Sequence, residues 1–330
     1  MKILFLGYEE YLSFILRDLK KTNFFIENKV DVIFAKPNFK NFPKKLLKLI
    51  KNKDYSKLHE AILIKLNRLL YKNKIKTVNQ KLFFRENVIG LKEEKKIRVI
   101  EYDGLKNIKG LNDYDFMIVA SFGTKIPSQI FRKPKHKTLN IHPSLLPKHR
   151  GGYPTYVQAC NFEKEVSTTI HFMEEKWDNG DVVIQDSIDC NSNLTNYERY
   201  QKSAHLASLL LQRLSEGNFN LELAKQDKES ISYCHKLTKV KKNINSFLKE
   251  DSLQGYVLSN YASHLFPFSY IRRGFLLMSI LEVSPSKEVY KGKKDTCLFK
   301  KNDKMYLNHF GKIFFINKYI YKGNIITQEK

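Results

Sequence analysis

The stretch from Thr138 to Gly152 reads TLNIHPSLLPKHRGG and joins a short apolar segment to a loop rich in polar residues, proline and glycine. Asn140 and His142 are two positions apart, so their side chains point the same way if the segment is extended. In an open α/β sheet, ligands bind just beyond the carboxyl ends of the strands. A single histidine after a strand is usually structural, but this concentration of polar residues and glycines favours a reaction site.

Apolar runs on both sides of this stretch predict the strands of a sheet. Residues 3–6 form a continuous apolar run that ends at Gly7, and apolar residues then recur at helical spacing up to Leu19. Residues 30–35 and 115–121 are also largely apolar, as expected of strands buried on both faces. Strands that alternate with helices predict an α/β fold with a Rossmann-like, mostly parallel sheet.

Residues 38–95 interrupt this alternation. They are rich in lysine, and Leu58, Ile62, Leu66 and Leu69 fall on one face of a predicted amphipathic helix. We therefore predict a helical insertion between two strands. A structural, covering role is favoured over ligand binding.

The chain changes character after residue 219. Residues 197–214 predict a helix that stops at Gly217 and closes a first domain, residues 1–219. Residues 220–238 are predicted to be a linker. Residues 239–330 hold short β-like runs separated by glycine, aspartate and asparagine, which predict a small C-terminal β domain with an OB-like barrel.

A second group of polar residues, Trp177-Asp178-Asn179-Gly180-Asp181, lies between two extended segments, 168–173 and 182–186. Aspartate and asparagine before glycine are ordinary turn residues, so a plain hairpin loop is one interpretation. The other is that Asp178 supplies a carboxylate that pairs with His142 and fixes the orientation of its ring.

The composition restricts the class of protein. The 330 residues carry 58 lysines and arginines against 34 acidic residues, a net charge of +24 that attracts polyanions such as RNA. Only ten of the basic residues are arginine, and an AT-rich genome gives the same bias without selection for binding. The longest apolar runs fall short of the ~18 residues that a membrane span needs. Four scattered cysteines without a CxxC pair predict neither a disulfide framework nor a zinc site, and fit the cytoplasm.

The two polar groups together resemble a known family. Asn-x-His-x-Ser-Leu-Leu-Pro followed by Arg-Gly, then Thr-Ile-His and Asp-x-Gly-Asp, is similar to the 10-formyltetrahydrofolate-dependent formyltransferases. The resemblance is strong over residues 112–186 and fair at the first strand. It implies transfer of a formyl group from the folate co-substrate to a primary amine, without a metal.

The resemblance also implies roles for individual residues. Asn140, His142 and Asp178 correspond to the family's catalytic set, in which Asn140 and protonated His142 stabilise the formyl oxygen and Asp178 relays the proton. Gly7, Tyr8, Arg150 and Gly151 are expected on the side of the acceptor. The residues expected to bind the folate are Phe122, Gly123, Thr124, Lys125, Ser144, Trp177, Asn179, Gly180 and Asp181.

The acceptor is the open part of this hypothesis. Residues 233–239 resemble the segment that opens the C-terminal domain of methionyl-tRNA formyltransferases, which favours initiator tRNA. The sequences Gly7-Tyr8-Glu9-Glu10 and Gly152-Tyr153-Pro154 depart from that branch and leave an amino sugar on a nucleotide sugar as the alternative. A hypothesis of another class is a non-catalytic RNA-binding protein on the same scaffold. The sequence does not predict an oligomeric state.

Overall fold

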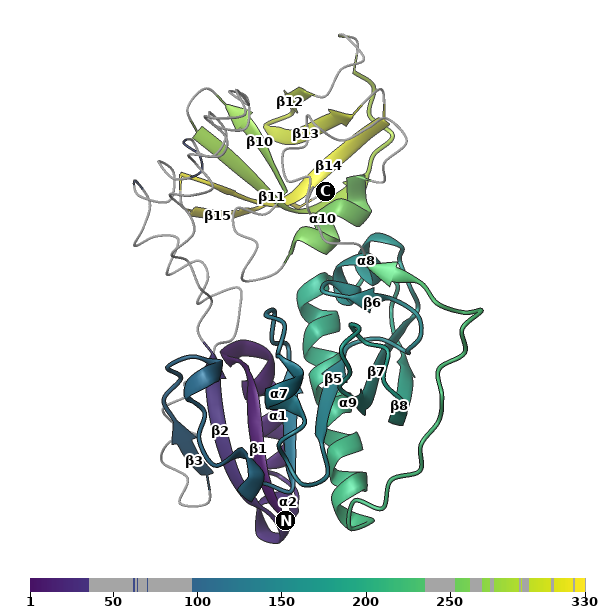
Figure 1. Cartoon of the computed structure of the whole chain (residues 1–330). Helices are drawn as coiled ribbons and strands as arrows, with labels where there is room; N and C mark the ends of the chain where they lie inside the picture. The colour runs from purple at the N-terminus through teal and green to yellow at the C-terminus, as the bar shows by residue number, and fades with distance from the viewer. Residues whose placement is uncertain are drawn as a thin grey trace, which may run out of the picture.

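The computed structural model describes residues 1–35, 97–234, 253–261, 269–273, 276–290, 292, 297–309, 312–322 and 324–329, together with 62, 64 and 70. Its first part is built on a seven-stranded sheet with the order β3-β2-β1-β4-β5-β7-β8 (Figure 1). The first five strands in this order are parallel, and β7 and β8 are antiparallel to their neighbours. The strands are β1 (Lys2–Tyr8), β2 (Lys29–Ala35), β3 (Ile97–Ile100), β4 (Phe116–Ala120), β5 (Thr138–His142), β7 (Glu165–Phe172) and β8 (Val182–Asp189).

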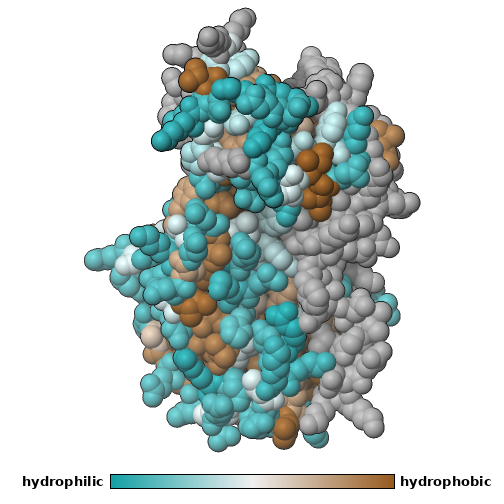
Figure 2. Space-filling model, turned by 180° about the vertical axis from the view of Figure 1, so that it is seen from behind, coloured by the Kyte–Doolittle hydropathy of each residue, from teal (hydrophilic) through white to brown (hydrophobic). Residues whose placement is uncertain are grey.

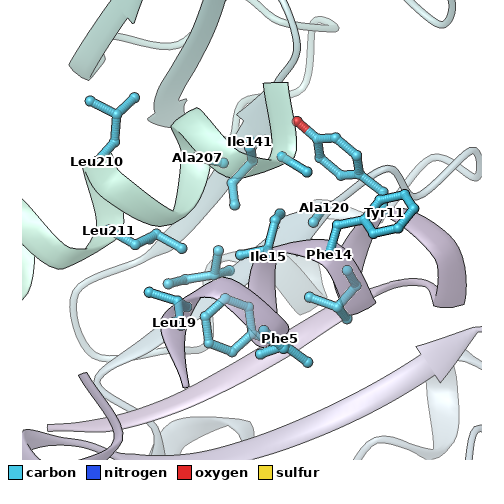
Figure 3. Packing of buried hydrophobic residues seen from close by; sticks show 14 of the residues in the cluster. Phe5, Tyr11, Phe14, Ile15, Leu19, Ala120, Ile141, Ala207, Leu210 and Leu211 are labelled. Carbon is cyan, nitrogen blue, oxygen red and sulfur yellow. The ribbon is translucent and has the colours of Figure 1, made fainter. Parts of the chain in front are cut away.

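One face of the sheet is covered by the two longer helices of this part, α1 (Glu9–Leu19) and α9 (Asn196–Glu216). Figure 3 shows Phe14 and Ile15 of α1 and Leu211 of α9 packed together with Phe5 of β1. The N-terminus of α9 is fixed by a capping box, in which the Thr195 and Glu198 side chains bind each other's backbone N–H groups. Burial of the apolar stripes of both helices therefore holds this layer to the sheet.

The opposite face carries shorter elements. The 3-10 turns η2 (Leu105–Asn107) and η3 (Leu111–Asp113) and the helix α7 (Ser128–Phe131) pack with Leu4, Leu6 and Met117 in a second core. The remaining short helices are α2 (Phe24–Glu27) and α8 (Pro154–Cys160). Both faces of β1 and β4 are covered, which fits the continuous apolar runs 3–6 and 116–120 in these strands.

The second part is a six-stranded antiparallel sheet with the order β10-β11-β14-β13-β12, in which β15 also pairs with β14. It contacts the first part through α10 (Leu253–Asn260), which packs on α8, and Asn196 at the start of α9 donates to the carbonyl of Ser259 (2.9 Å). The prediction of a mostly parallel sheet followed by a small β domain is confirmed. The strands are β10 (Ser269–Arg273), β11 (Leu276–Pro285), β12 (Cys297–Lys301), β13 (Lys304–His309), β14 (Lys312–Tyr321) and β15 (Asn324–Thr327).

Between α9 and the second part, the chain returns to the first sheet. Ala224 forms an antiparallel bridge with Val182, and β9 (Tyr233–Cys234) pairs in parallel with β6 (Arg150–Gly151). The described part of the stretch predicted as a linker, residues 220–234, is thus hydrogen-bonded to the edge of the sheet and to the loop after β5. The rest of that stretch, 235–238, and the predicted helical insertion 38–95 lie outside the described residues, apart from residues 62, 64 and 70, which are helical.

Where the described residues form the side opposite to Figure 1, their surface is mostly hydrophilic, with smaller hydrophobic areas between (Figure 2). Within the described ranges, no helix combines the length and the apolar character that crossing a bilayer requires. The same ranges contain no group of three or more histidine, cysteine, aspartate or glutamate side chains arranged to hold a metal ion.

Candidate active site

The strand β5 carries Asn140 and His142 at the centre of the site. It lies between β4, to which it is parallel, and β7, to which it is antiparallel. In the register of β5 and β7, Asn140 is opposite His171 and His142 is opposite Thr169. Because β5 and β7 pair in antiparallel fashion, polar residues of the two strands lie beside each other at the carboxyl end of β5.

Asp178 reaches the same place from the loop between β7 and β8. Its Oδ1 lies 3.4 Å from Nδ2 of Asn140 and 3.7 Å from Nδ1 of His142. Its Oδ2 accepts a hydrogen bond from the backbone N–H of Gly151 (2.7 Å). Asp178 has a left-handed backbone, with φ 52°, which an aspartate adopts more readily than most residues. The structure thus brings together the three residues for which the sequence predicts a catalytic role.

His142 is hydrogen-bonded at one ring nitrogen and faces a carboxylate at the other. Its Nε2 lies 2.9 Å from the carbonyl oxygen of His149, and because a carbonyl only accepts, this nitrogen carries a proton. Its Nδ1 faces the Asp178 carboxylate. The carbonyl of His149 also accepts from the Cys234 thiol (3.4 Å), whose pKa is raised to about 12 by burial. The imidazole is buried, and the hydrogen bond from Nε2 orients it with Nδ1 towards Asp178.

His171 belongs to this site, although the sequence does not single it out as a site residue. Its Nδ1 donates to the carbonyl of Phe172 (2.8 Å), so its Nε2 is free to accept a hydrogen bond from Nδ2 of Asn140 (3.1 Å). Burial is the largest cause that lowers its pKa, to about 4, and the neutral ring that results suits an acceptor. His171 therefore fixes which way the Asn140 amide points. The motif Thr-Ile-His contains the signal that would have found it.

Arg150 binds the loop between β7 and β8 that carries Asp178. Only 4% of it is exposed, and its Nη1 donates to Oδ1 of Asn179 (2.8 Å). Its Nε and Nη2 donate to Oε1 of Gln226, at 3.1 and 2.6 Å. The guanidinium for which the sequence predicts acceptor binding is thus engaged by two side chains of the protein. Gln226, from the predicted linker, is a second site residue that sequence reasoning misses.

The residues expected to bind the folate are placed in different ways. Trp177, beside Asp178, is 54% exposed, and Gly123 and Thr124 are exposed in the loop after β4. Ser144 is buried, and its hydroxyl donates to the carbonyl of Lys148 (2.7 Å). A Cβ on Gly180 would lie 1.9 Å from the carbonyl oxygen of Phe172. Ser144 and Gly180 therefore shape the two loops, and Trp177 offers an accessible ring.

The remaining predicted residues meet at the carboxyl ends of β1 and β4. A Cβ on Gly7 would lie 2.1 Å from the carbonyl oxygen of Ala120, so the glycine allows the two strands to approach. The ring of Tyr8 lies 5.9 Å from that of Phe122, which is in turn 6.3 Å from the ring of Tyr102. These three rings form an aromatic cluster beside the loop that begins at Phe122. Of the other expected residues, Lys125 is exposed, and Asp181 is partly buried with its backbone carbonyl bound by Phe172 N–H (2.9 Å).

Comparison with known proteins gives relatives over the first part of the chain. A methionyl-tRNA formyltransferase of Mycoplasma mycoides subsp. mycoides is 32% identical over 162 residues, which is 48% of this chain and 50% of that protein. A protein of the same name from Rickettsia prowazekii is 32% identical over 157 residues, 46% of this chain and 52% of that protein. The chain thus spans about half the length of the curated relatives it matches.

Solved structures match over nearly the whole chain. The N-formyltransferase from Helicobacter canadensis, in complex with folinic acid and dTDP-3-aminofucose, aligns over 96% of this chain and 99% of its own, with a TM-score of 0.57 and 17% identity. HypX from Aquifex aeolicus, in complex with tetrahydrofolic acid, aligns over 97% and 44%, with a TM-score of 0.55 and 15% identity. At these identities the likeness is one of fold. The family described as Formyl transferase matches residues 1–214, well over half of the chain, and the protein belongs to that family.

Proposed function

We propose that this protein transfers the formyl group of 10-formyltetrahydrofolate to a primary amine. The observation that carries the proposal is that Asn140, His142 and Asp178 meet, although they come from two separate segments. Nδ2 of Asn140 and Nδ1 of His142 lie 3.4 and 3.7 Å from Oδ1 of Asp178. An amide N–H, an imidazole and a carboxylate form a suitable set of donors and acceptors for acyl transfer to an amine. Membership of the formyl transferase family supports the same reaction.

The donor set fits a formyl group. When bound, the folate supplies the formyl carbon on its N10 atom. The 3.4 Å contact from Asn140 to Asp178 is the weaker of the two that the Asn140 amide makes, so a formyl oxygen would replace that contact and leave the bond to His171 in place. Asn140 and His142, the latter donating from a proton-bearing Nδ1, would then stabilise the charge that develops on the formyl oxygen.

Asp178 has the second role in this proposal. Its Oδ1 is within reach of both the imidazole and the place where the formyl group would bind. It would accept the proton that the attacking amine loses and return a proton to the departing nitrogen. The bond from Gly151 N–H to Oδ2 leaves Oδ1 as the oxygen that takes part.

For the acceptor we propose the amino group of methionyl-tRNA. Two relatives at 32% identity carry that name, and the net charge of +24 favours a polyanionic substrate. With this acceptor the enzyme would work in the cytoplasm, in protein biosynthesis.

A second candidate acceptor is an amino sugar on a nucleotide sugar. The observation that favours it is the aromatic cluster of Tyr8, Tyr102 and Phe122, since Tyr8, expected on the acceptor side, has a partly exposed ring that would suit a nucleobase. Its fold neighbour from Helicobacter canadensis was solved with dTDP-3-aminofucose. A non-catalytic RNA-binding protein remains the alternative of another class.

The test is release of tetrahydrofolate, followed spectroscopically, with charged initiator tRNA and with amino-sugar nucleotides as acceptors. Turnover with tRNA, and binding that weakens steeply as salt rises, would support the proposal. Turnover with the sugar nucleotide alone would show that the acceptor is an amino sugar, while the proposed formyl transfer would stand. Tight tRNA binding without turnover of any amine would overturn the enzyme and favour the binding protein.

A further inference from the structure

The side chain of Gln226 uses its full hydrogen-bonding capacity next to the candidate site. Its Nε2 donates to the backbone carbonyls of Asp178 (2.9 Å) and Gly180 (2.8 Å). Its Oε1 accepts from both Nε and Nη2 of Arg150. An amide has two N–H donors and a carbonyl oxygen with two lone pairs, so all four positions are occupied.

These bonds join three segments that are far apart in the sequence. Arg150 is in β6, Asp178 and Gly180 are in the loop between β7 and β8, and Gln226 follows α9. Asn179, between the two carbonyls that Gln226 binds, takes the remaining bond from Arg150 through its side chain. The loop is therefore held at three successive residues.

Asp178 depends on this support because its own backbone is in the left-handed region, at φ 52°. Its carbonyl is fixed by Gln226 while its carboxylate is fixed by Gly151 N–H. A rotation of the peptide would move Oδ1 away from Asn140 and His142. Displacements of about 1 Å in a reacting group typically reduce rates about 100-fold.

We propose that Gln226 is a positioning residue for formyl transfer: it binds Arg150 and the backbone of the loop and so holds the Asp178 carboxylate against Asn140 and His142. This inference rests on the proposed function of the site. It also explains why the chain returns to the sheet after α9, since β9 and the bridge at Ala224 flank Gln226 on both sides.

The chemistry requires an amide at this position. A methionine has a similar length but leaves Arg150 and two carbonyls without these partners. A glutamate still accepts from Arg150, but its second oxygen would face the carbonyl oxygens of Asp178 and Gly180 and repel them. Both Gln226→Met and Gln226→Glu therefore remove the hydrogen bonds to the loop, and only the glutamate keeps an acceptor for Nε and Nη2 of the buried Arg150.

The experiment compares these two variants with Gln212→Met, a control in which a glutamine on α9 loses a hydrogen bond to Glu216 at the surface. We expect kcat to fall about 100-fold in Gln226→Met and Gln226→Glu, while KM for the acceptor changes less than threefold and Gln212→Met is unchanged. If Gln226→Met does not fold, Gln226→Glu carries the test. Wild-type kcat in a folded Gln226 variant would overturn the proposal.

A double-mutant cycle separates positioning from a general loss of stability. In an Asp178→Asn background, removing Gln226 should cost less than about threefold, because there is no carboxylate left to position. An equal loss in both backgrounds would overturn the inference.

If the wild-type protein turns over no amine, the proposed function fails, and hydrogen exchange then decides the role of Gln226 alone. The Gly151 amide, which donates to Asp178 Oδ2, should exchange at least about tenfold faster in Gln226→Met and at the wild-type rate in Gln212→Met. Unchanged exchange in both would overturn the positioning role.

Discussion

Nδ2 of Asn140 lies 3.1 Å from Nε2 of His171, across the antiparallel pair formed by β5 and β7. Asn140 is the donor in this hydrogen bond. The proton of the neutral His171 ring is on Nδ1, which donates to the carbonyl of Phe172, so Nε2 can only accept. A neutral histidine with one fixed tautomer thus determines which atom of the Asn140 amide faces Asp178.

His142, whose Nδ1 lies 3.7 Å from the Asp178 carboxylate, should be essential for turnover. His142→Ala removes a donor to the formyl oxygen, so we expect kcat to fall about 100- to 1,000-fold in a protein that still folds. His205→Ala is the matched control, since His205 lies on α9, is about half exposed and pairs with Asp18. Comparable rates in the two variants would remove His142 from the mechanism.

The Asp178 carboxylate should be equally necessary. Asp178→Asn keeps the size of the side chain but loses the base, so kcat should fall about 100-fold or more. Asp189→Asn, on an exposed residue at the end of β8, is the control. Measured rates near wild type for Asp178→Asn would show that another group moves the proton.

His171 should make folding stability depend on pH. Its pKa is lowered from 6.5 to about 4 in the folded protein. As the pH falls, this imidazole is therefore protonated in the unfolded chain before it is protonated in the folded protein. Stability should therefore be constant above about pH 6.5 and fall as the pH is lowered towards 4, by a total on the order of 3 kcal/mol. Urea unfolding at several pH values measures this slope. His171→Leu should flatten it, and an unchanged slope in that variant would assign the proton to a different group.

The sequence predicts much of the sheet and the catalytic set because their signals are local. The apolar runs of β1 and β4 identify strands, and the spacing of Asn140 and His142 aligns their side chains. Gln226 carries no such signal, because its three partner residues are 46 to 76 positions away and are brought to it only by the folded chain. The stretch around it is polar and lacks periodicity, which is typical of a linker.

Gly180 should tolerate no side chain. Because a Cβ there would lie 1.9 Å from the carbonyl oxygen of Phe172, Gly180→Ala must displace backbone in the loop that carries Asp178. We expect a clear drop in melting temperature together with loss of turnover. Gly152→Ala is the matched variant, since a Cβ at that position meets no atom within 4 Å. Equal melting temperatures for the two alanine variants would contradict this packing.

Arg199 should be important for stability without taking part in the reaction. Its fully buried guanidinium donates to the backbone carbonyls of Glu163, Glu165, Ser192 and Leu194. Arg199→Met would leave these carbonyls without that donor, so the free energy of unfolding should fall by about 3 kcal/mol or more. Arg213→Met, which breaks an exposed pair with Asp186, should change it by less than about 1 kcal/mol. Denaturant titration distinguishes the two.

The pairing of β6 with β9 sets a limit on how this chain can be recombined with its relatives. A chimera joined at residue 219, directly after α9, would exchange Gln226 and β9 along with the C-terminal sheet and would leave Arg150 facing a foreign sequence. A junction after Cys234 would keep every described contact of that strand pair within one parent. Exchangeable modules in this protein therefore begin after Cys234, 18 residues beyond the end of α9 at Glu216.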